Sequence, residues 1–171
     1  MQRDTKGFTL IEVVVTLTIL VIVVTLATPS GQKFLANQRA SGQSRTIYNA
    51  IQLAKVTAIK EGRSVTISFW SDEDTPVSDA SNSLRRKFKM VRLEWDENGD
   101  GAIGSDEREL AVSVTEKGGV ECDTNQNTIS YNSRGLLFGS NQGTISTRNA
   151  YREYRVVLNI LGTIRQENVS L

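Results

Sequence analysis

The stretch from Phe8 to Ala27 constrains this chain more than any other, because it is 20 residues long and carries a single charge, at Glu12. A helix of this length spans roughly 30 Å at about 1.5 Å of rise per residue, which is the thickness of the hydrocarbon layer of a bilayer. The sequence therefore predicts a transmembrane helix. A carboxylate inside such a helix costs about 2.5 to 3.5 kcal/mol on insertion scales, so we expect Glu12 to have a function and a partner.

A short polar leader, residues 1–7, precedes the apolar run and carries the basic residues Arg3 and Lys6. Such a leader is typical of an export signal, but the apolar run is longer than the core of about 7 to 15 residues that a cleaved secretory signal has. Basic residues before a membrane helix favour an amino terminus in the cytoplasm. The sequence therefore predicts a single-pass protein of the inner membrane whose carboxyl-terminal domain lies in the periplasm.

Gly7 followed by Phe8-Thr9-Leu10-Ile11-Glu12 resembles the class III signal of type IV pilins and type II secretion pseudopilins. The resemblance implies that prepilin peptidase cuts after Gly7, methylates the new amino terminus at Phe8 and leaves Glu12 as the fifth residue. Phe8 and Glu12 are four residues apart, which on a helix is one face. The new ammonium could then pair with Glu12 of the same or a neighbouring subunit, and the resemblance implies that this pair guides assembly. The alternative is an acid at a frayed helix end that reaches toward the interface.

The residues after the apolar run predict a second, different half of the helix. Thr28-Pro29-Ser30-Gly31 is expected to bend or loosen it, because proline removes a backbone donor. Helical spacing of apolar residues then resumes at Ile47, Ile51, Ala54 and Ala58. Gly62 suits the residue just after a helix end.

From Ser64 onward the apolar period changes to two, which predicts β-strands that pack on the amphipathic helix. The expected strands are Val65 to Trp70, Leu84 to Trp95, Glu109 to Thr115, Thr128 to Asn132, Gly143 to Thr147 and Tyr151 to Ile160. The fold class is α+β, with a long helix packed on an antiparallel sheet, as in pilins. The expected divisions are a leader at 1–7, a transmembrane helix at 8–28, its amphipathic continuation at 29–62 and a periplasmic β-sheet domain at 63–171.

The β domain is similar to the GspH/FimT-like minor pseudopilins and minor pilins. The similarity rests on a strand ending at Trp95, the turn that follows it, the strand that begins near Glu109, and a late apolar strand followed by Gly162. It implies a non-catalytic subunit of a type II secretion pseudopilus or type IV pilus, in the filament or at its tip. The implied partners are prepilin peptidase, other pilins or pseudopilins, and the inner membrane.

The turn after Trp95 fits the twelve-position calcium loop D-x-N-x-D-G-x5-E. Its oxygen ligands would come from Asp96, Asn98, Asp100, the carbonyl of Ala102, and Glu107. The flanking residues read as strands rather than as the two helices of an EF-hand, and Asp, Asn and Gly are also what a hairpin turn requires. The loop is therefore either a structural Ca²⁺ site or an ordinary hairpin.

An enzymatic function finds little support, because the chain has no histidine and one cysteine, Cys122. A Ser-His-Asp triad, the common zinc sites and an internal disulfide are excluded on that ground.

The second candidate function is a tip module that binds DNA for natural transformation, or that serves adhesion. Arginines gather toward the carboxyl end, with Tyr151 and Tyr154 among them, and such a surface suits phosphates and bases; these arginines are Arg148, Arg152, Arg155 and Arg165. Some FimT-like pilins bind DNA through a G-R-x-R motif. In this chain Gly162-Thr163-Ile164-Arg165 lacks the first arginine of that motif. The alternative to DNA binding is that these arginines are ordinary side chains on a strand face.

Overall fold

The computed structural model describes residues 7–72, 75–77, 86–95, 109–114, 119–138 and 143–170. The chain forms two compact units, Met1–Leu35 and Ala36–Leu171. One helix, α1 (Leu10–Glu61), contributes to both. The helix is continuous through Thr28–Gly31. The expected bend or loosening at the proline stays a prediction.

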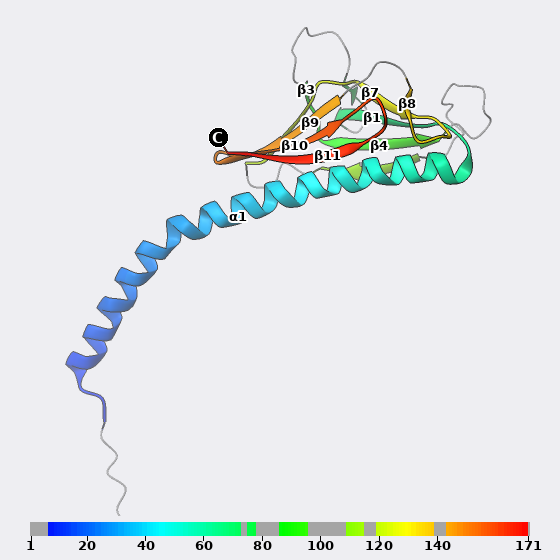
Figure 1. Ribbon diagram of the computed structural model, residues 1–171. Coiled ribbons are helices and arrows are strands. Elements are labelled where there is room, and N and C mark those ends of the chain that lie inside the picture. The colour runs from blue at the N-terminus through cyan, green and yellow to red at the C-terminus, as the bar shows by residue number, and fades with distance from the viewer. Residues whose placement is uncertain are drawn as a thin grey trace, which may run out of the picture. The chain divides into compact units, whose positions relative to one another are not determined.

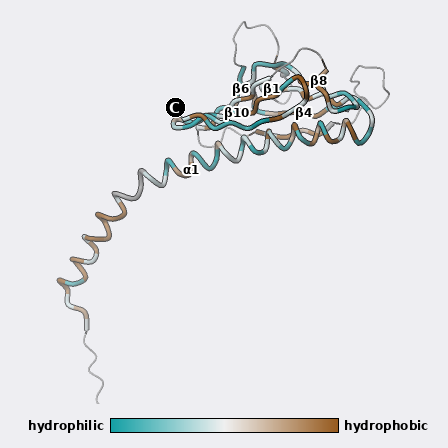
Figure 2. The backbone as a smooth tube through the Cα atoms, in the orientation of Figure 1, coloured by the Kyte–Doolittle hydropathy of each residue, from teal (hydrophilic) through white to brown (hydrophobic). Residues whose placement is uncertain are grey.

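In the first unit α1 presents apolar side chains on every side. The large apolar side chains between Leu10 and Val24 are 47 to 83% exposed, and Figure 2 shows this part of the helix in the colours of hydrophobic residues. Within the described residues, α1 is the helix that is long and apolar enough to cross a membrane. A helix that is apolar all round is stable where it is surrounded by lipid or by other apolar helices.

Three threonines interrupt the apolar run of α1 without leaving a polar group unpaired. The hydroxyl of Thr16 donates to the carbonyl of Val13 at 2.9 Å. The hydroxyls of Thr18 and Thr25 donate to carbonyls three or four residues earlier, both at 2.8 Å. Polar groups in hydrocarbon must find their partners inside the protein. These threonines therefore suit a membrane helix as well as the aliphatic residues around them do.

The second unit holds α1 residues 36–61 against two antiparallel sheets (Figure 1). Sheet A has the order β5-β4-β1-β7-β8, with β2 paired to β1, and sheet B has the order β11-β10-β9-β6-β3. The strands are β1 (Val65–Asp72), β2 (Thr75–Pro76), β3 (Arg86–Lys87), β4 (Met90–Trp95), β5 (Glu109–Ser113), β6 (Glu121–Thr124), β7 (Thr128–Tyr131), β8 (Leu137–Phe138), β9 (Gly143–Arg148), β10 (Arg152–Leu158) and β11 (Ile164–Ser170).

One core joins the helix to both sheets. The predicted stripe of α1 is completely buried, with Ile47, Ile51, Ala54 and Ala58 all at 0% exposure. It belongs to the same cluster as inward-facing side chains of β1 and β4 in sheet A and of β9 and β10 in sheet B, which include Val65, Ile67, Phe69, Val91, Leu93, Ile145, Val156 and Leu158. Alanine at two positions of the stripe lets the helix backbone approach the sheets closely.

Polar contacts and a close approach of two turns complete the joint between α1 and sheet B. Gln166 Nε2 donates to the buried Ser44 Oγ at 2.9 Å, and Lys55 Nζ donates to the carbonyl of Gly162 at 2.8 Å. Gly162 has a φ of +71°, and a Cβ there would lie 2.2 Å from the carbonyl oxygen of Gly135. Glycine is therefore required where the turn after β10 meets the turn before β8.

The pattern of period two predicted most strands but not their division into two sheets. β1, β4, β5, β7, β9 and β10 lie where strands were expected. The expected strand Leu84 to Trp95 is two strands in the described residues, β3 and β4, which belong to different sheets. The expected strand Tyr151 to Ile160 ends earlier, because β10 stops at Leu158 and Ile160 lies 47% exposed in the turn that follows. Four strands were missed: β6 and β11, whose sequences are largely polar, and β2 and β8, which are only two residues long.

Gly62 ends α1 as predicted. The helix stops at Glu61, and Gly62 has a φ of +68°, the left-handed conformation that glycine adopts without a steric penalty.

We expect Ile51→Ala to lower the free energy of unfolding of the second unit by about 2 to 5 kcal/mol, because it opens a cavity where helix and sheets meet. Val56→Ala is the matched control, since Val56 lies on the same helix and is 56% exposed. Urea denaturation of the full chain in detergent micelles, followed by Trp fluorescence, measures both. Equal losses in the two variants would contradict this account of the core.

Candidate functional site

The predicted processing site lies in an open segment just before α1. Gly7, Phe8 and Thr9 are not helical, and the helix begins at Leu10. Phe8 is 83% exposed. A Cβ at Gly7 would meet nothing within 4 Å, and its φ is not in the left-handed region. Neither packing nor backbone conformation in the uncut chain therefore requires glycine at this position.

Thr9 caps the first turn of α1, and Glu12 stands three residues later. The amide of Glu12 donates to the Thr9 carbonyl at 3.1 Å and approaches Thr9 Oγ1 at 3.4 Å. The amide of Val13 also donates to the Thr9 carbonyl, at 3.3 Å. Threonine followed three residues later by glutamate is the sequence of a capping box, and an acid in the first turn is favoured by the helix dipole. Thr9 is thus a functional residue of the helix start that the sequence reasoning missed, although its T-x-x-E signal was there.

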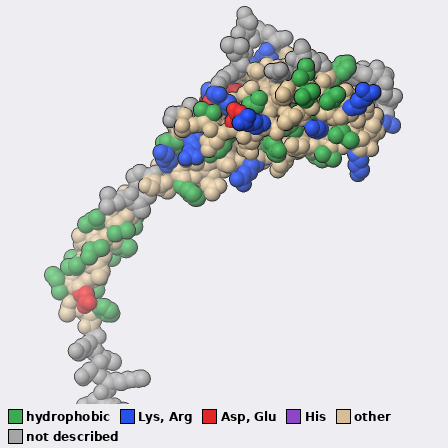
Figure 3. Space-filling model, viewed as in Figure 1, with side chains coloured by type: hydrophobic (Ala, Val, Ile, Leu, Met, Phe, Trp, Pro, Cys, Tyr) green, Lys and Arg blue, Asp and Glu red, His purple; other side chains and the backbone are tan. Residues whose placement is uncertain are grey.

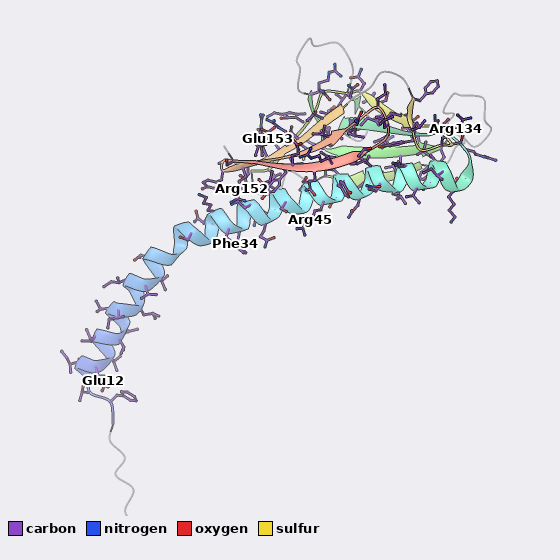
Figure 4. All side chains as sticks on the ribbon, viewed as in Figure 1. Glu12, Phe34, Arg45, Arg134, Arg152 and Glu153 are labelled. Atoms are coloured by element: carbon purple, nitrogen blue, oxygen red, sulfur yellow. The ribbon has the colours of Figure 1, made fainter. Side chains whose placement is uncertain are left out.

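The predicted helical face shared by Phe8 and Glu12 is wrong for the uncut chain. Phe8 precedes the capping residue, so it lies outside the helix on which Glu12 sits. The reason is the cap itself, because Thr9 turns the chain out of the helical direction. The exposed Glu12 carboxylate has no hydrogen bond or ion pair with any residue that the structure describes, and Figure 4 shows it at the start of α1.

Three of the four arginines proposed for DNA binding are paired with carboxylates of sheet B. Arg148 Nη2 lies 2.9 Å from Glu121 Oε2, and Arg155 Nη2 lies 2.9 Å from Glu153 Oε2. Arg165 Nε lies 3.4 Å from Glu167 Oε1. Arg148 and Glu121 are cross-strand neighbours, whereas the other two pairs each lie two residues apart on one strand, β10 or β11. Each of these arginines has an acid beside it, so the three side chains do not form a basic patch.

The fourth of the proposed arginines is Arg152. Arg152 is exposed, and Figure 4 shows it at the opposite end of the second unit from Arg134. On the face that Figure 3 presents, Lys and Arg side chains are scattered among other types over the second unit. A phosphate backbone is bound by a continuous basic surface, and this arrangement does not provide one.

The ion pairs of sheet B shift the pKa values of their members. Hydrogen bonds from Lys87 and then from Arg148 hold the pKa of Glu121 below its ordinary value. The same hydrogen bond to Glu121 raises the pKa of Arg148, and the bond to Glu153 raises the pKa of Arg155. Lys87, Glu121 and Arg148 therefore form a charged network over strands β3, β6 and β9 that is stable at neutral pH.

The predicted calcium loop, with Asp96, Asn98, Asp100, Ala102 and Glu107, lies outside the described residues. Within the ranges that the structure does describe, no three His, Cys, Asp or Glu side chains are grouped so as to hold a metal ion.

The fold and the amino-terminal segment together define a class: a pilin-like α+β protein with one long apolar helix at its start. Comparison with known proteins agrees. The model of the prokaryotic N-terminal methylation motif matches residues 2–28, and that of the type II transport protein GspH matches residues 43–162. The chain therefore belongs to the GspH family of minor pseudopilins and minor pilins.

Two solved structures resemble the chain at low sequence identity. The type IV minor pilin FimU of Pseudomonas aeruginosa, in space group P21, has a TM-score of 0.51 and 12% identity, over 79% of this chain and 90% of that one. The minor pseudopilin EpsH from the type 2 secretion system of Vibrio cholerae has a TM-score of 0.49 and 16% identity, over 75% of this chain and 96% of that one. At such identities the first likeness shows the fold alone. No curated protein sequence matches the chain significantly.

We predict that the Tm of Glu121→Gln falls less than the Tm of the parent chain as the pH is lowered. A carboxylate whose pKa is lowered on folding, from 4.5, contributes stability that is complete above the unfolded pKa and is lost as the pH falls through the folded pKa. Glu121 is partly exposed, so its removal should lower the Tm at pH 7 by at most about 4 °C. The measurement is the Tm from about pH 7 to pH 3, with the exposed Glu61→Gln at the end of α1 as the control. An unchanged slope in Glu121→Gln would contradict the role of the network.

Proposed function

We propose that this chain is a non-catalytic minor pilin or pseudopilin subunit, cut by prepilin peptidase after Gly7 and assembled through its amino-terminal helix. The observation that carries the proposal is the state of that helix start: an exposed Gly7, a capped first turn and a Glu12 carboxylate without a partner among the described residues. They lie within the methylation motif at residues 2–28, on a chain of the GspH family.

The first unit supports insertion in the inner membrane. Its apolar side chains are exposed and its threonine hydroxyls are paired within the helix. Burying this surface in lipid would be worth roughly 25 cal/mol for each Å² removed from water. Arg3 and Lys6 favour a cytoplasmic amino terminus. In that orientation residues 1–7 are the leader, 8–28 cross the membrane and 63–171 lie in the periplasm.

The identity of Gly7 supports recognition by an outside partner. A Cβ at this position would meet nothing within 4 Å, so alanine would fit without strain in the uncut chain. A glycine that the fold does not need, placed beside an exposed bond at a non-helical segment, suits a peptidase that requires a small residue before the cut.

Glu12 supports assembly through a charge that cutting creates. Cleavage after Gly7 would convert the amide nitrogen of Phe8 into an ammonium two residues before the helix start. The capped first turn places the carboxylate of Glu12 near that end of the helix without a partner of its own among the described residues. An ammonium and a carboxylate that pair in a membrane each lose less hydration energy than they would alone.

The family serves both type II secretion and type IV pili, and we assign the chain to this pair of machines without choosing between them. The matching model carries the name of the type II transport protein GspH, and the likeness to a type IV minor pilin concerns the fold. DNA binding is not favoured as a second function, because Arg148, Arg155 and Arg165 are paired with acids.

We expect Glu12→Ala to be cut normally but to enter filaments at a level reduced at least about tenfold, because the new ammonium would lose its partner. Gly7→Leu should instead accumulate as the uncut precursor in the membrane. Immunoblots of membrane and sheared-filament fractions, from cells with the cognate machine, distinguish the two variants. Normal filament entry of Glu12→Ala would remove the pairing argument.

We also propose that Asp96, Asn98, Asp100, Ala102 and Glu107 bind a structural Ca²⁺, on the strength of their complete loop pattern. Extracytoplasmic loops of this kind bind with a Kd of about 0.1 to 1 mM. Isothermal titration of the full chain in micelles should give saturable heat with CaCl₂ that Asp100→Ala abolishes. An absence of heat in the parent chain would refute the site.

A further inference from the structure

Sheet B has an outer face that the core does not use. Along β10, Tyr154, Val156 and Leu158 point into the core, so Arg155 and Val157 belong to the opposite face. The register of the sheet sets five residues of that face in one row across five strands. The row is Lys87, Asp123, Ser146, Arg155 and Glu167, each paired with the next.

A polar pocket of about 360 Å³ opens on this row. Its lining includes Asp123, Asn125, Thr144, Ser146, Arg155 and Glu167. Directly paired residues of neighbouring strands have Cβ atoms about 5 Å apart. The small side chain of Ser146, between Asp123 and Arg155, therefore leaves the hollow at the centre of the row.

Asp123 is the residue of the pocket that most favours a bound ligand. Its side chain is 3% exposed, and its Oδ2 is buried and accepts no hydrogen bond. The cation beside it is Arg148, whose Nη2 lies 3.5 Å from Oδ2, beyond good hydrogen-bond length. Arg148 already donates two hydrogen bonds to Glu121, at 2.9 and 3.1 Å. A buried carboxylate with so little compensation is costly, and an additional donor would stabilise it.

The other charges around the pocket are already matched. Arg155 donates to both carboxylate oxygens of Glu153, at 3.0 and 2.9 Å. Glu167 lies 3.4 Å from Arg165, and Lys87 donates to Glu121 at 2.8 Å. The charged residues in the lining, Asp123, Arg155 and Glu167, sum to −1. The lining alone therefore carries one net negative charge. The buried Oδ2 of Asp123 has the guanidinium of Arg148 at 3.5 Å but accepts no hydrogen bond from the described residues.

We propose that this pocket binds a primary ammonium group, the end of a lysine side chain presented by a neighbouring protein subunit. An ammonium has three donors, and the acceptors in the pocket are the carboxylate of Asp123 and the hydroxyls of Ser146 and Thr144. Neither hydroxyl has a partner among the described residues. Val157 at the rim offers an apolar contact for the lysine stem.

Other ligand classes fit this lining less well. An anion would meet the two carboxylates, Asp123 and Glu167. A divalent cation would find too few ligands, because the described residues provide no group of three acidic, His or Cys side chains. That the lysine belongs to a neighbouring subunit rests on the proposed function, because a filament subunit packs against other subunits.

The test titrates Nα-acetyl-lysine methylamide into the ¹⁵N-labelled full chain in detergent micelles and follows the backbone amide signals. We expect saturable shifts confined to the neighbourhood of Asp123, Asn125, Thr144 and Ser146, with a Kd of about 1 to 10 mM for a single side chain. The Nε-acetylated analogue, which has no charge, should cause no shift. Asp123→Asn should weaken binding at least about tenfold, whereas Glu94→Gln, a carboxylate of sheet A, should leave it unchanged.

Three results would overturn the proposal. The first is no saturable shift in the parent chain, and the second is an equal response to the neutral analogue. The third is a response at these amides to CaCl₂ alone, which would assign the pocket to a metal. Ser146→Val guards against a folding artefact of Asp123→Asn, because it fills the hollow without changing charge and should also abolish binding. The titration needs no filament, so its outcome is independent of the assembly test. Lysine binding can be absent while Glu12→Ala still impairs filament entry, and it can be present while Glu12→Ala enters filaments normally.

Discussion

The packing of one stripe of α1 against two sheets is the contact on which the rest of the second unit depends. Sheet A and sheet B each have one apolar face, and both faces meet at Ile51 and Ala54, which are fully buried. Neither sheet could keep its order of strands without that cover, because its apolar face would be left in water. The polar contacts Gln166 to Ser44 and Lys55 to Gly162 then fix sheet B on the helix. These contacts do not involve the outer row of sheet B, which includes Asp123, so that row is left for other partners.

The first half of the same helix requires apolar surroundings, and the proposed function depends on this requirement. Apolar side chains that are exposed in the isolated chain need lipid or apolar neighbours. The internally bonded threonines make such an environment tolerable. A carboxylate at Glu12, in the first turn of that segment, is tolerable there when a cation joins it. Cutting after Gly7 would supply the cation, so that processing and assembly become two steps of one electrostatic event.

The sequence predicted the features that depend on local spacing. The buried stripe at Ile47 to Ala58, the helix end at Gly62 and strand β1 follow from periodicity and from backbone preference alone. It did not predict two sheets, because strand pairing depends on which edges meet in space. For the same reason Arg148 looked like part of a basic surface, because its partner Glu121 lies on a neighbouring strand. The partner of Arg155, Glu153, lies two residues away on the same strand. The pocket at Asp123 is lined by residues of β6, β9, β10 and β11, so no local sequence motif could predict it.

The most direct test of the central claim is the intact mass of the chain recovered from the membranes of cells that contain prepilin peptidase. The claim is that α1 becomes an assembly element only after the bond between Gly7 and Phe8 is cut. It predicts the mass of residues 8–171 with one added methyl group, located at the amino terminus of Phe8 by fragmentation. A mass equal to the full 171 residues, in membranes where other pilins are processed, would contradict it.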